Sequence, residues 1–151
     1  TRCHRVTGVQ TCALPISDPA IDEQVSLEEL LKRSDIVSLH CPLTADTKGM
    51  IGKDQLALMK KSALLINTAR GGVLDSAALA DALEKGEIAG AACDVFETEP
   101  PLPTDHPLLH CPNTIVTPHI AFASVESMEQ RADIVFNNLY SWLDGKQVNA
   151  V

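Results

Sequence analysis

Short apolar runs alternate with helix-like segments along most of the chain. The runs are almost continuously apolar, and each is bounded by polar or turn-forming residues. They are DIVSLH (35–40), SALLINT (62–68), IAGAACDVF (88–96) and NTIVTP (113–118). Because nearly unbroken apolar strands are typical of parallel sheets buried on both faces, with helices on either side, the pattern predicts an α/β fold with a parallel sheet.

Helix signals lie before, between and after these strands. Ser26 and Glu29 have the spacing of a capping box at the start of SLEELLKR, and KDQLALMKK (53–61) is a second helical segment. Asp75 is placed to cap SAALADALEK, with Gly86 at its end. A last helix from about Ser124 to Leu143 carries one apolar stripe, which we expect to be core. The stripe consists of Val125, Met128, Ala132, Val135, Leu139 and Trp142.

The first sixteen residues do not follow this pattern. As a secretory signal they fail, because the polar stretch TGVQT (7–11) interrupts any apolar region. Codons that encode VTGVQTCALPI (6–16) match a common sequencing-library adapter, so residues 1–16 are predicted to be translated adapter, with a natural flexible arm as the alternative. Residues 17–144 then form the domain, and residues 145–151 are its tail.

Charge and cysteine content narrow the possible partners. The 151 residues carry 12 Lys and Arg against 20 Asp and Glu, a net charge of −8, which disfavours nucleic acid and anionic membranes as partners. No apolar run is long enough to span a membrane. Cys41, Cys93 and Cys111 form no disulfide framework, which favours a reducing cytoplasm. His106 and His110 precede Cys111 without a second ligand pair, so no metal site is expected.

Polar residues follow the expected strands. Because ligands of parallel sheets bind outside the carboxyl ends of the strands, these segments are where functional residues are expected. Together they hold an arginine, several carboxylates and a histidine, which suits general acid/base chemistry with an anion clamp. The segments are Ser17-Asp18-Pro19, residues 40–44, residues 67–72, residues 94–100 and residues 117–121.

Four of these stretches, HCPLT, NTARGGVLD, GAACDVFETEP and TPHIA, resemble in order the signatures of the D-isomer-specific 2-hydroxyacid dehydrogenases. The resemblance covers residues 17–151 and implies an oxidoreductase that uses NAD, with NADP disfavoured, on a small 2-oxo or 2-hydroxy acid. The catalytic group it implies is Arg70, Glu99 and His119. The cofactor-binding residues it implies are Asp18, Cys41, Pro42, Thr47, Thr68, Ala69, Arg70, Asp94, His119 and Ala121, the last standing where many relatives carry Gly.

The chemistry gives each residue type a reason. The planar guanidinium of Arg70 can bind a carboxylate through paired hydrogen bonds and polarise the adjacent ketone. In the family, His119 exchanges the proton with the hydroxyl oxygen, and Glu99 orients the ring and favours its protonated form. Asp94 would accept a hydrogen bond from the nicotinamide carboxamide, and Asp18 from a ribose hydroxyl.

One family feature is missing. No G-x-G-x-x-G occurs in the chain, although Asp18 matches the residue that normally ends the second strand, about twenty residues after that loop. We therefore expect a partial Rossmann-type doubly wound parallel sheet that lacks its first strand, its Gly-rich loop and the substrate domain, with DIVSLH as an exposed edge.

Two functions remain open. The first is a dehydrogenase fragment, inactive alone, from a parent that is a homodimer. The second is a non-catalytic NAD-sensing module of the corepressor type, since such relatives can keep all three catalytic residues. Glyoxylate, hydroxypyruvate, 3-phosphoglycerate and lactate-type acids all stay possible as substrates.

Overall fold

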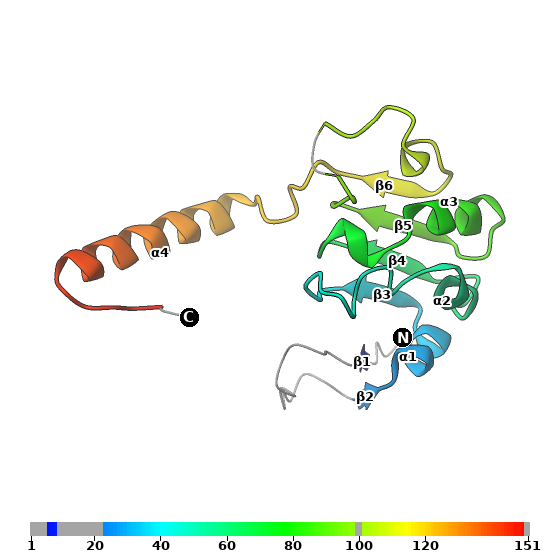
Figure 1. Ribbon diagram of the computed structural model, residues 1–151, viewed down its shortest axis with the longest axis horizontal. Coiled ribbons are helices and arrows are strands. Elements are labelled where there is room, and N and C mark those ends of the chain that lie inside the picture. The colour runs from blue at the N-terminus through cyan, green and yellow to red at the C-terminus, as the bar shows by residue number, and fades with distance from the viewer. Residues whose placement is uncertain (1–5, 9–22, 99–100, 150–151) are drawn as a thin grey trace. The chain divides into compact units, whose positions relative to one another are not determined.

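A computed structural model of the chain describes residues 6–8, 23–98 and 101–149 (Figure 1). The chain divides into two compact units, Thr1–His119 and Ile120–Val151. No helix among the described residues is both long enough and apolar enough to cross a membrane.

A four-stranded parallel sheet forms the centre of the first unit (Figure 1). Its strands lie in the order β3 (Ile36–Leu39), β4 (Leu64–Asn67), β5 (Gly90–Cys93) and β6 (Thr114–Val116). The register aligns the last residue of every strand in one row, from Leu39 through Asn67 and Cys93 to Val116. The predicted parallel sheet is confirmed, and β3 is its end strand, as expected for DIVSLH.

A separate pair of strands precedes this sheet in sequence. β1 (Val6–Gly8) and β2 (Glu23–Val25) run parallel, with Val6 opposite Glu23. β1 lies within the stretch that sequence analysis predicts to be translated adapter. The rest of that stretch, together with Asp18, lies outside the described residues.

The helices begin where the capping signals predict. Ser26 is the N-cap of α1 (Leu27–Arg33), and its hydroxyl accepts a hydrogen bond from the backbone N–H of Glu29. α2 (Lys53–Ala57) follows Gly52 and is shorter than the nine-residue segment that its sequence pattern suggested. The helix ends at Ala57, because the next residue, Leu58, is its C-cap, with its N–H bonded to the carbonyls of Gln55 and Leu56.

The helix α3 (Ser76–Glu84) is capped at both ends. The Asp75 carboxylate accepts from the backbone N–H of Ala78, which confirms the predicted N-cap. Gly86 follows the C-cap residue with φ of 64°, a left-handed conformation that glycine adopts without steric cost. Two 3₁₀ turns, η1 (Gly71–Val73) and η2 (Pro107–Leu109), complete the unit.

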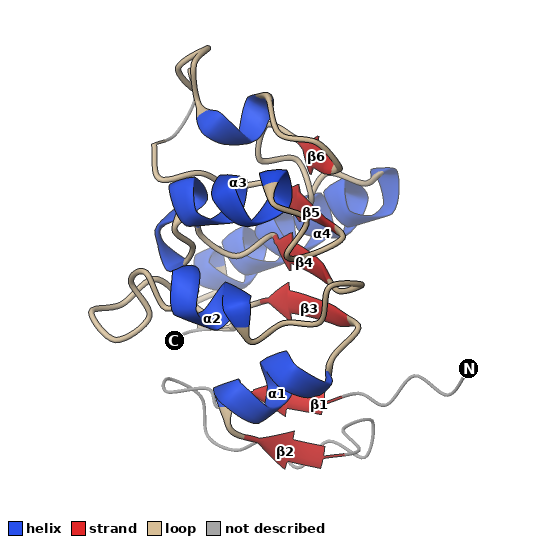
Figure 2. Ribbon diagram, turned by 90° about the vertical axis from the view of Figure 1, so that its right-hand side faces the viewer, coloured by secondary structure: helices blue, strands red, loops and turns tan. Residues whose placement is uncertain are grey.

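Among the described residues of this unit, helices cover only one face of the sheet. α2 and α3 lie on the same side of the strands (Figure 2), where Leu56 and Leu79 join Val37, Leu65 and Cys93 in one core. On the opposite face of the sheet the large apolar side chains are exposed: Ile36 (56%), Leu64 (42%) and Ile115 (67%). The expectation of burial on both faces is therefore wrong for the described residues. The apolar run identifies a strand, but it does not supply the helices that would cover a second face.

The second unit holds α4 (Val125–Leu143), which begins after Ser124. No residue of α4 is buried, and the stripe predicted to be core is exposed, with Val125 at 74%, Val135 at 62% and Trp142 at 69%. The predicted helix is thus confirmed, whereas the predicted burial of its stripe is wrong. A unit whose described part contains a single helix has no second element on which an apolar stripe can pack.

Close backbone packing fixes the loop that follows β4. A Cβ atom built on Gly71 would lie 1.8 Å from the carbonyl carbon of Phe96, which is backbone and cannot rotate away. A Cβ built on Gly72 would meet only the side chain of Leu43, at 3.0 Å. Gly71 is therefore required for close approach between the segments after β4 and β5.

Replacement of Gly71 by alanine is expected to destabilise the fold by about 3 kcal/mol or more, because the backbone at Phe96 must move. The matched substitution Gly72→Ala is expected to cost far less, since the Leu43 side chain is 47% exposed and free to shift. Urea unfolding of both variants measures the difference. Equal losses for the two variants would contradict the packing argument.

Candidate active site

The parallel register brings four loops to one edge of the sheet. β3 is followed by Cys41 and Pro42, β4 by residues 68–70, β5 by Asp94, and β6 by residues 117–119. Since all four strands end in the same row, the segments predicted to carry function after β3 to β6 lie at a single edge.

Buried Asn67 organises this edge. Its side chain is fully buried, at 0% exposure, and its amide donates to the carbonyl of Arg70 at 3.1 Å. Its side-chain oxygen accepts from the N–H of Ala69 at 3.1 Å, and its carbonyl accepts from the N–H of Asp94 at 2.9 Å. One asparagine therefore shapes the Arg70 loop and ties that loop to the end of β5.

Arg70 is exposed at the end of the loop that Asn67 shapes. Its Nη1 donates to the carbonyl of Ala69 at 2.7 Å, a local bond that occupies one of its five donors. Ala69 is buried and Thr68 exposed, so the turn anchors its middle residue and presents the guanidinium to solvent. The remaining donors can bind an anion.

Asp94 joins the ends of β5 and β6. It is 4% exposed, and its Oδ1 accepts from the hydroxyl of Thr117 at 2.5 Å. Its carbonyl accepts from the N–H of His119 at 2.9 Å, and His119 has a positive φ of 58°. A non-glycine residue with positive φ is uncommon, and such residues gather at functional sites. Asp94 thus holds Thr117 and His119 beside the end of its own strand.

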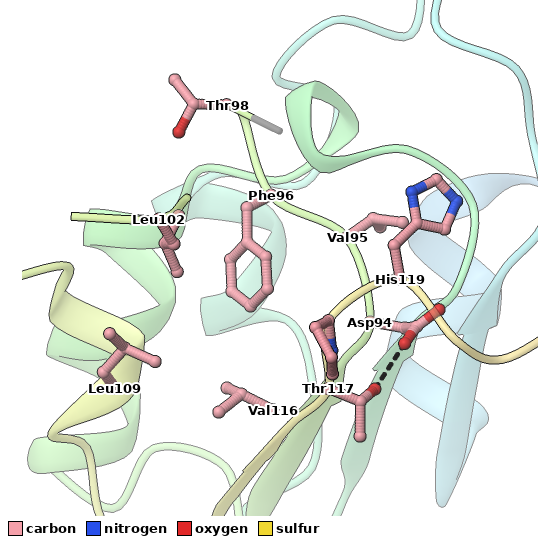
Figure 3. A pocket seen from close by; sticks show the side chains of 10 residues that line it. Asp94, Val95, Phe96, Thr98, Leu102, Leu109, Val116, Thr117 and His119 are labelled. Carbon is pink, nitrogen blue, oxygen red and sulfur yellow. Dashed lines mark hydrogen bonds between the residues drawn. The ribbon is translucent and has the colours of Figure 1, made fainter. Parts of the chain in front are cut away.

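A mostly apolar cavity of about 210 Å³ adjoins these residues (Figure 3). Figure 3 shows Phe96, Leu102, Leu109 and Val116 around it, with Asp94, Thr117 and His119 along one side. An apolar cavity with a few polar groups at its border is the usual form of a small-ligand site.

Thr47 has a structural role in this arrangement. It is 3% exposed, and its hydroxyl donates to the carbonyl of Pro42 at 2.7 Å and accepts from the N–H of Thr44 at 2.8 Å. These bonds fold the loop after β3 back on itself and keep Pro42 and the half-buried Cys41 at the sheet edge.

Three predicted site residues are not brought to this edge by the described structure. Asp18 and Glu99 lie outside the described residues. Ala121 is exposed and belongs to the second compact unit, Ile120–Val151. The residues that the structure brings together are Cys41, Pro42, Thr47, Thr68, Ala69, Arg70, Asp94 and His119.

Glu97 has no role of its own among the sequence predictions beyond its place in the segment 94–100, yet its side chain links two elements. One carboxylate oxygen accepts from the N–H of Ser76, the first residue of α3, at 3.3 Å. The other lies 3.4 Å from Nε2 of His106, whose Nδ1 accepts from Leu108 and so leaves the ring proton on Nε2. The ring of His106 also meets Phe96 edge-on at 5.2 Å. Partial burial acts to raise the pKa of Glu97, but the hydrogen bonds from Ser76 and His106 outweigh it and lower that pKa.

The thiol of Cys93, at the end of β5, has low reactivity. It is 2% exposed, and burial raises the pKa of its thiol to about 12. A protonated thiol is a poor nucleophile and metal ligand, so Cys93 acts as a small core residue. This agrees with its interpretation from the sequence.

Asn67→Ala is expected to destabilise the chain by about 1–3 kcal/mol, because the partners of the lost amide stay buried or constrained. The amide of Ala69 should lose protection from hydrogen exchange more than amides in α2. Native-state hydrogen exchange tests this, with Asn137→Ala, at an exposed position of α4, as the control. Unchanged protection at Ala69 would show that the loop does not depend on Asn67.

Glu97→Gln is expected to change the pH dependence of stability. Since the pKa of Glu97 is lowered from 4.5, its contribution is fully present above the unfolded-state pKa and disappears as pH falls through the folded-state pKa. The variant should therefore be less stable than the parent chain at pH 7, and the two should converge as pH falls through the lowered pKa of Glu97. Urea unfolding across this range measures the gap. A gap that is constant with pH would exclude a role for the carboxylate charge.

Comparison with known proteins identifies the family of this chain. The family described as "D-isomer specific 2-hydroxyacid dehydrogenase, NAD binding domain" matches residues 4–121. Glycerate dehydrogenase of Methylorubrum extorquens is 51% identical over 133 residues, which are 86% of this chain and 42% of that protein. Glyoxylate reductase of Thermofilum pendens is 49% identical over 129 residues, 85% of this chain and 38% of that protein.

Solved structures give the same result. D-lactate dehydrogenase with NAD⁺ from Lactobacillus jensenii superposes with a TM-score of 0.82 at 34% identity, over 97% of this chain and 47% of that one. An acyclic imino acid reductase in complex with NADPH and D-Arg superposes with a TM-score of 0.83 at 34% identity, over 98% of this chain and 46% of that one. The chain spans about two fifths of the length of the curated relatives above. By profile, identity and fold, the chain belongs to the D-isomer specific 2-hydroxyacid dehydrogenase family and represents part of its NAD-binding domain.

Proposed function

We propose that this chain is the cofactor-binding part of an NAD-dependent oxidoreductase that interconverts a D-2-hydroxy acid and its 2-oxo acid. The observation that carries the proposal is the meeting of Arg70, Asp94 and His119 at the carboxyl edge of one parallel sheet. A fixed cation, a buried carboxylate and an imidazole at one edge are the groups that reversible reduction of a 2-oxo acid requires. The relatives described above are named as dehydrogenases and reductases, which favours an enzyme over a non-catalytic NAD sensor.

The described residues fit the nicotinamide end of the cofactor. Asp94 is a buried carboxylate that can accept from a carboxamide N–H₂, and the adjoining cavity has the apolar lining that an aromatic ring needs. Cys41 and Pro42 would border the cofactor after β3. The phosphate end has no such match, because no G-x-G-x-x-G occurs in the 151 residues. NAD is proposed over NADP on the strength of Asp18, whose carboxylate would repel a ribose phosphate.

Arg70 is proposed to bind the acid. Its guanidinium can donate two parallel hydrogen bonds to the substrate carboxylate while the adjacent ketone oxygen is polarised by the same charge. The side chain of Asn67 bonds the backbone of Ala69 and of Arg70, so the backbone that carries the guanidinium is held in place. When bound, the cofactor supplies hydride transfer to and from C2 of the acid.

His119 is proposed to carry the proton. Reduction of the ketone leaves negative charge on its oxygen, and an imidazolium can give that oxygen a proton; in the reverse direction the neutral ring accepts it. The bond from the His119 N–H to the Asp94 carbonyl fixes the backbone that presents this ring. Glu99 is proposed as the carboxylate that orients the ring, on the basis of the family resemblance.

An exchange experiment tests the proposal. The segment of Methylorubrum glycerate dehydrogenase that matches this chain is replaced by the chain, and NADH oxidation is followed with hydroxypyruvate and glyoxylate. The chimera is expected to turn over at least one of them. Arg70→Lys should then lower kcat/KM by about 100-fold, because lysine cannot form the paired hydrogen bonds.

The control for that experiment is Arg131→Lys on α4, which lies beyond the matched residues 4–121 and should leave kcat/KM unchanged. The chain alone should turn over neither acid, since it has no Gly-rich loop. A folded chimera without turnover, or an Arg70→Lys chimera as active as its parent, would exclude the proposed role of this site.

A further inference from the structure

A second pocket lies beside Arg70 and holds another cation. Its volume is about 630 Å³, and its lining includes Lys48 and Arg70 together with Asp75 and Glu97. Neither the function proposed above nor the family resemblance gives Lys48 a role. Lys48 is exposed, and its side chain forms no ion pair within the part of the chain that the structure describes.

Backbone hydrogen bonds fix the Lys48 segment against the Arg70 loop. The N–H of Gly49 donates to the carbonyl of Gly72 at 2.8 Å, and the N–H of Ile51 donates to the carbonyl of Val73 at 3.1 Å. A third bond runs from the N–H of Asp75 to the carbonyl of Ile51 at 2.9 Å. The two cations therefore stand on neighbouring segments whose backbones are hydrogen-bonded to each other.

The two carboxylates of the pocket are engaged elsewhere. Asp75 accepts from the N–H of Ala78, and Glu97 accepts from the N–H of Ser76 and faces His106. The bonds to Ala78 and Ser76 place the two carboxylates at the N-terminus of α3, where the helix dipole favours negative charge. The carboxylates thus offset the positive end of α3, while Lys48 and Arg70 keep their charges available to a ligand.

We propose that Lys48 determines substrate specificity: the pocket takes a 2-oxo or 2-hydroxy acid that carries a second anionic group, bound by Lys48 while Arg70 binds the first carboxylate. A lysine ammonium is a mobile point charge, which suits a terminal carboxylate or phosphate. This inference rests on the proposed function, because it takes Arg70 as the group that binds the carboxylate next to the reacting carbon.

Matched ligands test the proposal on the full 151-residue chain by ¹⁵N NMR titration, observed at the amides of Gly49, Gly71 and Gly72. The first pair is 2-oxoglutarate and 2-oxovalerate, which have the same five carbons and differ in the terminal carboxylate. The second pair is 3-phosphoglycerate and D-glycerate, which differ in the phosphate. We expect the doubly anionic member of at least one pair to bind about fivefold more tightly, with a smaller difference at high salt.

Three variants separate the possible results. Lys48→Gln should remove the preference within the pair, whereas Lys53→Gln, which deletes an exposed lysine outside the pocket, should retain it. Arg70→Gln should weaken every ligand. If the ligands bind and Arg70→Gln weakens them, but Lys48→Gln leaves the preference unchanged, the role of Lys48 is excluded and the proposed function stands. If no ligand perturbs these amides, or Arg70→Gln has no effect, the binding role of Arg70 fails, and the inference fails with it.

Discussion

The hydrogen bonds of Asn67 are the interaction on which the rest of the site depends. The buried side-chain amide of Asn67 bonds Ala69 and Arg70 in the loop after β4, and its backbone carbonyl accepts from the N–H of Asp94 at the end of β5. Asp94 in turn holds Thr117 and His119 after β6. These hydrogen bonds thus connect the ends of three neighbouring strands, β4, β5 and β6. Because a buried polar group left unpaired is costly, each bond strengthens the constraint on the next, and the whole edge behaves as one unit.

The N-terminus of α3 provides the second constraint. Asp75 caps the helix from its own chain, while Glu97 reaches the same helix end from the segment after β5. Because Gly71 has no Cβ atom, its segment can lie in close contact with the Phe96 backbone. Charge, hydrogen bonding and steric fit therefore act at one place. The effect is that the loops after β4 and β5 are fixed to each other as well as to their strands.

Local signals in the sequence predicted much of this arrangement. Ser26 and Asp75 identify helix starts because a cap involves residues only three apart, and apolar runs identify strands whose parallel pairing brings Arg70, Asp94 and His119 to one edge. What the sequence could not predict depends on longer distances. Glu97 and His106 lie nine positions apart in the sequence, and their contact has no periodic signature. Asn67 could have been noticed as an asparagine that ends a strand before a turn, where such side chains often bond the following backbone. The exposure of one sheet face and of α4 depends on which elements are available to pack, which no local pattern records.

Burial of Cys93 has a consequence for how the protein meets oxidants and labelling reagents. Because burial raises the pKa of its thiol to about 12, Cys93 stays protonated at pH 7. Peroxide, glutathione disulfide and maleimides react with the thiolate, so the end of β5 is shielded from them by both access and charge. Cys41 is half-buried at the same sheet edge and lacks that degree of shielding. A fluorophore attached to Cys41 would therefore stand at the carboxyl edge of the sheet and leave the buried Cys93 of β5 unmodified.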